Sequence, residues 1–183
     1  MTKSLNELTG NEVATLLIPT TVTLLTARDE DGTDKVATIA WAMPISHEPS
    51  LIAVAIRPGG QTACAMRTSG SFIVNVLGAN EGAVSIAMTC GKKQGIDNRL
   101  AEAQLTTYPG AHVSAARIEQ AISWIECELV ESRVYGDHEL FIGRTLVAET
   151  RGMLDENSKL EPIPALLMGQ RGCFGHFEEG FSA

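Results

Sequence analysis

Short apolar stretches separated by turn residues set the hydrophobic pattern of this chain. Residues 21–27 (TVTLLTA) predict a strand, and after the polar turn 28–35 the stretch 36–43 (VATIAWAM) predicts a second strand that pairs with it as a hairpin. The stretch 51–56 (LIAVAI) is continuously apolar, which predicts a strand buried on both faces. Residues 71–77 (SFIVNVL) predict a further strand.

Strict alternation of apolar and polar side chains marks residues 123–131 (SWIECELVE). The apolar side chains fall on one face while Glu126 and Glu128 fall on the other, which predicts a half-exposed strand. A turn at 135–139 then leads into another predicted strand at 140–149.

Helical signals are fewer and shorter. Residues 62–70 predict a short helix that ends at Gly70. Residues 80–105 have a helical pattern that is interrupted at 90–95, and the sequence YPG at 108–110 predicts a loop. Several strands with tight turns and a few short helices favour an all-β antiparallel barrel over a doubly wound sheet.

The length and composition of the chain indicate one globular domain. We expect this domain to span 1–183, with a core at about 15–150 and a tail, 151–183, that wraps the barrel or a dimer. Apolar residues make up 44% of the chain and charged residues 20%. No apolar run approaches the roughly 20 residues that span a bilayer, and the N-terminus lacks the apolar core of a signal peptide. We therefore expect no membrane association and a cytoplasmic location.

Charge and motif content exclude several classes of function. The net charge of −8 argues against binding to nucleic acid or to an anionic membrane. The four cysteines form no CxxC pair and the histidines lack metal-ligand spacing, so no metal site is expected. The chain has no GxGxxG after a strand, no GxxxxGK[ST] and no GxSxG, which argues against Rossmann, P-loop and serine-hydrolase sites.

The stretch 37–46 (ATIAWAMPIS) contains small residues and hydroxyls but no acid or base. Small residues at a strand end let a flat ligand approach the backbone, whose N–H and C=O groups can bond its polar edge. Thr62 opens the predicted helix, where free N–H groups favour a phosphate. The alternative is a hairpin packed in a barrel, with Trp41 in the core and Thr62 as an ordinary N-cap.

A basic segment at 90–100 (CGKKQGIDNRL) stands out in an acidic protein. Its cations Lys92, Lys93 and Arg99 indicate an anionic ligand, and a solvated loop is the alternative.

His138 follows a turn at the entrance of a predicted strand. A histidine in this position can orient a substrate or donate a proton near neutral pH. The alternative is a plain turn in which Asp137 hydrogen-bonds the backbone.

Four blocks of the sequence, taken in order, resemble the flavin reductase-like family of FMN-binding split barrels. That family includes flavoredoxins and the reductase components of two-component monooxygenases. The blocks are 37–62, 71–77, 126–149 and, more loosely, 166–174. The resemblance spans roughly residues 15–175 and implies an antiparallel Greek-key split β-barrel of the FMN-binding type.

The resemblance also implies a set of flavin contacts. The first block would meet the isoalloxazine and ribityl chain, largely through its backbone, and Thr62 would hold the phosphate. The basic segment would assist, although Asn98-Arg99-Leu100 stands where the family often has Asp-Lys-Phe. The cofactor-binding residues implied are Thr38, Ile39, Ala40, Trp41, Ser46, Ala55, Ile56, Arg57, Thr62, Lys92, Lys93 and Arg99.

His138 matches the Gly-Asp-His motif of the family, which implies a catalytic position near the flavin and the nicotinamide. The implied activity is that of an NAD(P)H-dependent flavin reductase, in which NAD(P)H as co-substrate passes hydride to N5 of FMN, with FAD as the alternative flavin. A homodimer and a partner monooxygenase are expected. Two other functions stay open: a flavoredoxin-like electron carrier with little NAD(P)H activity, and a non-enzymatic ligand-binding barrel.

Overall fold

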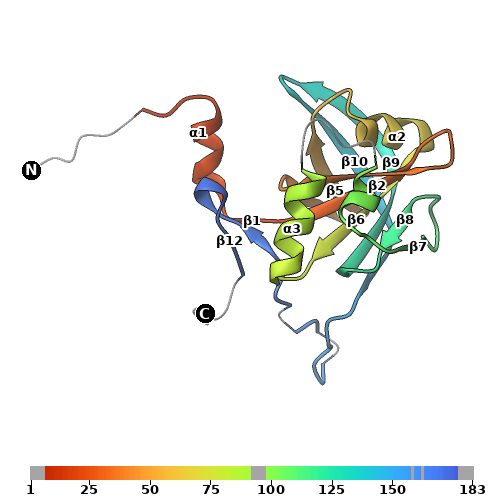
Figure 1. Cartoon of the computed structure of the whole chain (residues 1–183). Helices are drawn as coiled ribbons and strands as arrows, with labels where there is room; N and C mark the ends of the chain where they lie inside the picture. The colour runs from red at the N-terminus through yellow and green to blue at the C-terminus, as the bar shows by residue number, and fades with distance from the viewer. Residues whose placement is uncertain (1–6, 92–97, 158, 162, 177–183) are drawn as a thin grey trace, which may run out of the picture.

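An antiparallel seven-stranded sheet forms the centre of the molecule, with the strand order β3-β2-β6-β9-β10-β5-β4 (Figure 1). The structure is a computed structural model that describes residues 7–91, 98–157, 159–161 and 163–176. The strands of the sheet are β2 (Thr23–Arg28), β3 (Asp34–Ile39), β4 (Ala42–His47), β5 (Ser50–Ile56), β6 (Ser71–Leu77), β9 (Ala121–Tyr135) and β10 (His138–Thr150).

The two edges of this sheet are joined by a very short connection. β3 and β4 stand at opposite ends of the strand order, yet only residues 40–41 separate them in the chain. Three consecutive Cα–Cα steps span at most about 11 Å, so the sheet must curl until its edges nearly meet. The result is a barrel that is split between β3 and β4. The predicted mostly-β antiparallel split barrel is confirmed.

The curled sheet corrects one prediction and confirms another. The single strand expected at 36–43 is wrong, because the chain changes partner at Ala40–Trp41: β3 pairs with β2, whereas β4 pairs with β5. The hairpin predicted between the first two stretches is confirmed as β2 and β3, which a turn closes through the bond from Asp29 N to Thr33 O at 2.8 Å.

Burial on both faces is more complete in β2 than in β5. In β2 the side chains of Leu25 and Ala27 enter the barrel core, while Leu24 packs on the opposite side against α3 (Glu81–Cys90). In β5 only Ala53, Val54 and Ile56 are buried, because this strand lies beside the edge strand β4. The prediction that both faces of 51–56 are buried is therefore confirmed only in part: Ala53 and Val54, which point to opposite faces, are buried, and the remaining positions apart from Ile56 are half-buried.

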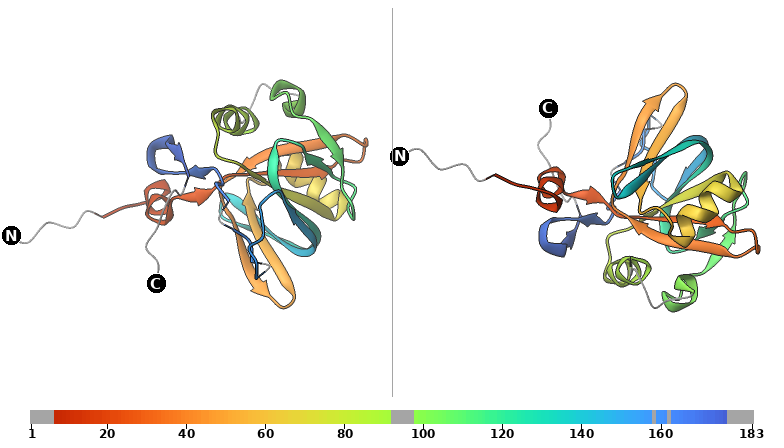
Figure 2. Two further views of the ribbon diagram at one scale, coloured as in Figure 1. Left: turned by 90° about the horizontal axis from the view of Figure 1, so that it is seen from below. Right: turned by 90° about the horizontal axis from the view of Figure 1, so that it is seen from above.

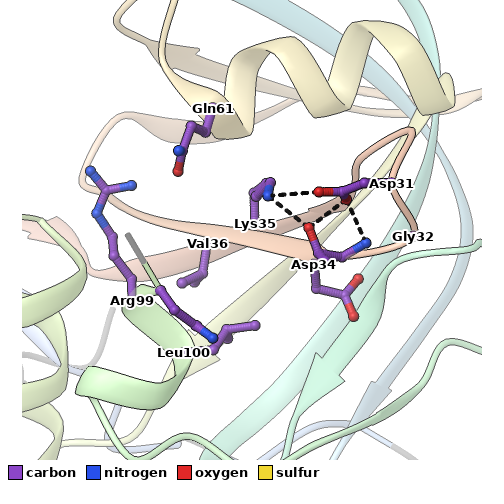
Figure 3. Close-up of a pocket in the computed structure, with 10 residues that line it drawn as sticks. Asp31, Gly32, Asp34, Lys35, Val36, Gln61, Arg99 and Leu100 are labelled. Atoms are coloured by element: carbon purple, nitrogen blue, oxygen red, sulfur yellow. Dashed lines mark hydrogen bonds and ion pairs between the residues drawn. The ribbon is translucent and has the colours of Figure 1, made fainter. Parts of the chain in front are cut away.

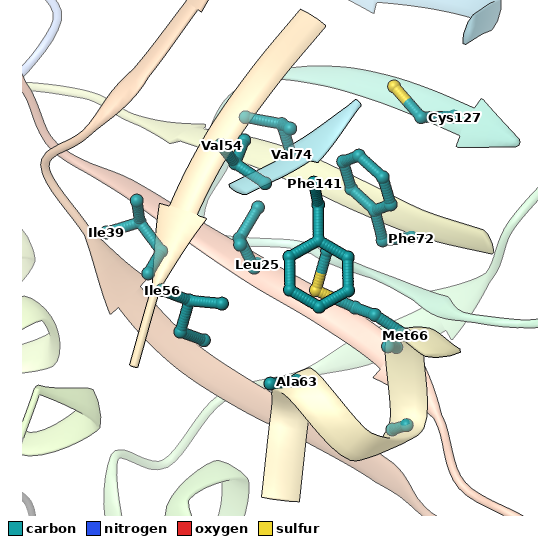
Figure 4. Close-up of a cluster of buried hydrophobic side chains, with 12 residues drawn as sticks. Leu25, Ile39, Val54, Ile56, Ala63, Met66, Phe72, Val74, Cys127 and Phe141 are labelled. Atoms are coloured by element: carbon teal, nitrogen blue, oxygen red, sulfur yellow. The ribbon is translucent and has the colours of Figure 1, made fainter. Parts of the chain in front are cut away.

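The barrel core is a cluster of aromatic, aliphatic and sulfur-containing side chains (Figure 4). Phe72 of β6 and Phe141 of β10 are fully buried in it. Helix α2 (Gln61–Ser69) closes one end of the barrel by inserting Ala63 and Met66 into the cluster. The helix predicted at 62–70 is confirmed, and it ends at Gly70, whose φ of 65° is left-handed.

Two further strands and one short helix complete the body. They are β7 (Thr107–Pro109), β8 (Ala116–Ile118) and α4 (Arg99–Glu102). The loop predicted at 108–110 is wrong in part, since Tyr108 pairs with Arg117 between β7 and β8. This pair covers part of β9 and buries Glu126, which was predicted to be exposed. No helix among the described residues is long and apolar enough to cross a membrane.

The N-terminal and C-terminal segments lie side by side, away from the barrel (Figure 2). β1 pairs with β11, and the two exposed leucines Leu16 and Leu17 precede β1. We call these segments the terminal arm. Its elements are α1 (Asn11–Ala14), η1 (Thr15–Leu17), β1 (Thr20–Thr21), β11 (Leu167–Met168), η2 (Gln170–Gly172) and β12 (Phe174–Gly175).

Candidate functional site

The split in the barrel places backbone polar groups at an open sheet edge. Asp29 and Thr33 form a hydrogen-bonded pair at the β2–β3 turn. Hydrogen-bonded and non-bonded residue pairs alternate along an antiparallel ladder. The pair of Thr38 with Leu24 lies five positions along the ladder from the bonded pair, so it is a non-bonded pair. The backbone N–H and C=O of Thr38 therefore point away from β2, toward the open edge of β3.

The side chain of Thr38 has a structural partner. Its hydroxyl donates to the carbonyl of Ala87 in α3 at 2.7 Å, which holds that helix beside β3. The neighbouring Ile39 is buried in the barrel core. At this edge Thr38 thus presents its backbone rather than its side chain, whereas the backbone of Ile39 faces Thr23 of β2.

The corner at Ala40–Trp41 brings three strands together. The carbonyl of Trp41 accepts the N–H of Ala55 in β5 at 2.9 Å. β5 in turn pairs with β10, with Ile56 opposite Glu139. Trp41 is 44% exposed, so the alternative that it fills the core is wrong.

His138 lies against this corner. The ring centroids of Trp41 and His138 are 4.5 Å apart and the ring planes are tilted by 37°. The Nδ1 atom of His138 lies 2.8 Å from a carboxylate oxygen of Asp137. This hydrogen bond is the main cause that lowers the pKa of Asp137 below its ordinary value. Asp137 therefore binds the ring of His138, which sequence reasoning had not foreseen.

Arg57 completes this group from the end of β5. Its guanidinium nitrogen Nη1 lies 4.0 Å from the second carboxylate oxygen of Asp137, and both side chains are exposed. The structure thus brings together Trp41, Arg57 and His138, which the sequence had assigned to one site. The Gly-Asp-His order of the turn was the available signal that Asp137 belongs with them.

The first turn of α2 carries an unusual hydroxyl. Thr62 is only 2% exposed, and its Oγ1 has no hydrogen-bond partner among the described residues. The N-cap of α2 is Gly60, which offers no side-chain cap, so the prediction of Thr62 as an ordinary N-cap is wrong. An unsatisfied hydroxyl beside the free N–H groups of a helix start is a setting that favours an anion.

A pocket of about 500 Å³ opens beside the same helix start (Figure 3). Gln61 of α2, Arg99 of α4 and Lys35 of β3 line it, and the side chain of Lys35 points toward Asp31. The ammonium of Lys35 pairs with Asp29 and Asp31 at 3.6 and 3.7 Å. The structure therefore places Arg99 near the start of α2, in a pocket that is also lined by Asp31 and Asp34.

Three other predicted residues are not brought into this group by the described structure. Lys92 and Lys93 lie outside the described residues. Ser46 lies toward the far end of β4, where it pairs with Leu51 next to a bulge. At about 3.3 Å per residue, roughly 15 Å of strand separates it from Trp41.

Comparison with known proteins identifies the family of this chain. The family model for the flavin reductase like domain matches residues 15–175. This chain belongs to the flavin reductase-like family. The NADH-dependent FMN reductase AsuE2 of Streptomyces nodosus subsp. asukaensis is 28% identical over 160 residues, which cover 86% of this chain and 78% of that protein.

Other relatives of this flavin reductase-like chain are matched only in part. Uncharacterized proteins of Pyrococcus abyssi and Aeropyrum pernix are 29% and 33% identical over 106 and 113 residues. These matches cover 58% and 61% of this chain. The chain spans only 60% and 42% of the length of those two relatives.

Solved structures show the same fold. The flavoredoxin of Desulfovibrio vulgaris (Miyazaki F) superposes with a TM-score of 0.83 at 22% identity, over 100% of this chain and 97% of that one. Component B of nitrilotriacetate monooxygenase from Bacillus cereus gives a TM-score of 0.83 at 20% identity, over 100% and 99% of the two chains.

Proposed function

We propose that this protein is an FMN-binding oxidoreductase that uses NAD(P)H to reduce flavin. The observation that carries the proposal is the buried hydroxyl of Thr62, which has no partner among the described residues and stands at the start of α2. Membership of the flavin reductase-like family and the similarity to an NADH-dependent FMN reductase support it.

The residues present fit FMN. The Thr62 hydroxyl and the N–H groups of the first turn of α2 would hold the phosphate, with Arg99 across the neighbouring pocket. The open edge of β3 at Thr38 and the corner at Ala40–Trp41 would accept the polar rim of the isoalloxazine. The same arrangement at the phosphate leaves FAD as the alternative flavin.

The chain supplies position and exclusion of water rather than acid–base chemistry. FMN, when bound, would supply the redox chemistry, which is the capacity of its N5 to take a hydride from a reduced nicotinamide. Trp41 and His138 would bound the side from which the nicotinamide approaches, and Arg57 adds positive charge there. Holding two flat rings in contact is the main demand of such a transfer, which is why no catalytic triad is needed.

A homodimer forms part of the proposal. The two edge strands of the sheet, β3 and β4, border the split. Edge strands carry unpaired backbone N–H and C=O groups, which another segment or chain has to cover. The terminal arm exposes Leu16 and Leu17, at 65% and 80%, away from the barrel. A second copy related by a two-fold axis would cover apolar surface of this kind. A monooxygenase that accepts the reduced flavin is the further partner we propose.

The deciding experiment is an anaerobic titration of the purified protein with FMN, followed by NADH and then NADPH, while the visible flavin band is recorded. Protein-dependent bleaching is expected, and the effective nucleotide identifies the donor. Bound flavin that neither nucleotide bleaches would instead support an electron carrier. Failure of FMN and FAD to bind would leave the ligand-binding barrel and remove residues 37–62 from any flavin site.

A further inference from the structure

Four side chains from three separate segments form one continuous group, which we call the His138 cluster. Trp41 comes from the β3–β4 corner, Arg57 directly follows β5, and Asp137 and His138 come from the β9–β10 turn and the first position of β10. The contacts run from Trp41 to His138 at 4.5 Å between ring centroids, from His138 to Asp137 at 2.8 Å, and from Asp137 to Arg57 at 4.0 Å.

The contact with Asp137 determines which nitrogen of His138 carries the proton. The hydrogen bond from His138 keeps the pKa of Asp137 below its ordinary value, so this carboxylate is ionised near neutral pH and can only accept a hydrogen bond. The proton of a neutral imidazole must then sit on Nδ1. The other nitrogen, Nε2, is left with a lone pair that can accept a hydrogen bond.

The other contacts restrict the ring of His138. Trp41 packs against the imidazole, and the His138 side chain is 22% exposed. Tyr135 lies opposite His138 on β9, and Glu139, the next residue on β10, is buried in an ion pair with Arg67. Arg57 approaches the other oxygen of the Asp137 carboxylate, at 4.0 Å from its Nη1.

We propose that Asp137 is a positioning residue that holds His138 in the Nδ1–H tautomer, so that Nε2 accepts a hydrogen bond from the carboxamide N–H of the nicotinamide. Trp41 keeps the ring in this orientation. The inference rests on the proposed reductase function and adds to it the group of the nucleotide that the site recognises. Recognition of an amide N–H by a fixed acceptor discriminates against nucleotides that lack this donor.

The first test needs no flavin and no turnover. Nitrogen NMR of the flavin-free protein, at a pH where imidazole is neutral, reports the tautomer of each histidine. We expect His138 in the Nδ1–H form in the wild type. In Asp137→Asn this form should be lost or mixed, since an amide can donate as well as accept. An Nε2–H tautomer in the wild type, or an unchanged tautomer in Asp137→Asn, would overturn the assignment.

The second test measures recognition of the carboxamide. Flavin reduction is followed with the nucleotide that bleaches the flavin and with its 3-acetylpyridine analogue, which has the carbonyl but no amide N–H. The two nucleotides differ in reducing power, but this difference is the same for every protein. It therefore cancels when the ratio of the two rates is compared between wild type and variants. We expect the rate with the natural nucleotide, divided by the rate with the analogue, to fall at least about tenfold in His138→Ala and Asp137→Asn. The control Glu131→Gln, which removes an exposed charge from β9, should leave this ratio unchanged.

The outcomes distinguish failure of the proposed reductase function from failure of the role inferred for Asp137. If no nucleotide bleaches the flavin in the wild type, the proposed function fails, while the NMR test still decides the tautomer. If bleaching occurs but the ratio is the same in wild type, His138→Ala and Asp137→Asn, the reductase proposal stands and the inference about Asp137 and the carboxamide is wrong.

Discussion

The guanidinium of Arg117 donates from Nε to a carboxylate oxygen of Glu126 at 2.7 Å, and both side chains are buried. The same carboxylate accepts the backbone N–H groups of Ala111 and His112, each at 2.7 Å. Arg117 also pairs with Glu149. This network ties the β7–β8 hairpin and the loop between its strands to β9 and β10.

Acid should weaken the fold through Glu126. Burial by itself would raise the pKa of Glu126, but the two backbone N–H groups and Arg117 outweigh it and hold the pKa below the ordinary 4.5. A carboxyl whose pKa is lowered by folding stabilises the fold at every pH above its pKa in the unfolded chain. This contribution is lost as the pH falls below about 4.5. Urea unfolding between pH 7 and 3 measures it.

Glu126→Gln is the matching variant. It should be less stable at pH 7 by about 3 kcal/mol, because it leaves the buried charge of Arg117 only partly paired. Its free energy of unfolding should also fall less steeply toward pH 3 than that of the wild type. Parallel pH profiles for the two proteins would show that Glu126 is not the titrating group.

A side chain at position 143 should disrupt the core. A Cβ on Gly143 would lie 2.5 Å from Cζ of Phe72 and 2.7 Å from Cβ of Cys127. We expect Gly143→Ala to lower the free energy of unfolding by about 1–3 kcal/mol, since neither neighbour can move without disturbing the packed core. Gly175→Ala, where a Cβ meets nothing within 4 Å, serves as the control and should unfold like the wild type.

Thr62→Val should stabilise the flavin-free protein but weaken its binding of FMN. Removing a buried hydroxyl that has no partner among the described residues should stabilise the flavin-free protein by about 1 kcal/mol. Losing a phosphate contact should weaken FMN binding by on the order of 1–2 kcal/mol. Thermal unfolding of the flavin-free protein and FMN titration check the two effects, and unchanged FMN affinity would remove Thr62 from the site.

His138→Ala should separate reduction from binding. We expect the rate of flavin reduction to fall at least about tenfold, with FMN affinity within about threefold of the wild type. Stopped-flow reduction and flavin titration measure these quantities. A parallel loss of both would assign His138 a structural role.

The terminal arm should control the oligomeric state if the homodimer forms through it. Leu17→Asp places a charge on a side chain that is 80% exposed, and should raise the dimer dissociation constant at least about tenfold. Met88→Asp, at a residue that is 58% exposed on α3, is the control and should leave dimerisation unchanged. Sedimentation velocity distinguishes the two variants, and equal behaviour would place the interface elsewhere.

Local signals in the sequence were sufficient for much of the fold. The end of α2 at Gly70 and the β2–β3 hairpin depend on turn residues and apolar spacing, which act over a few positions. The break between β3 and β4 depends on strands far apart in the chain, so the apolar run at 36–43 concealed it. Glu126 was misassigned for a similar reason, because its burial requires Arg117 from β8.

By itself, the sequence determined the β2–β3 hairpin, the helix that closes the barrel and the family to which the chain belongs. Only the tertiary structure decided that Trp41 packs on His138, that Asp137 binds the imidazole, and that the Thr62 hydroxyl is buried without a partner among the described residues. Secondary structure follows from neighbours along the chain. A site of this kind exists only after the sheet has curled and its two edges have been brought together.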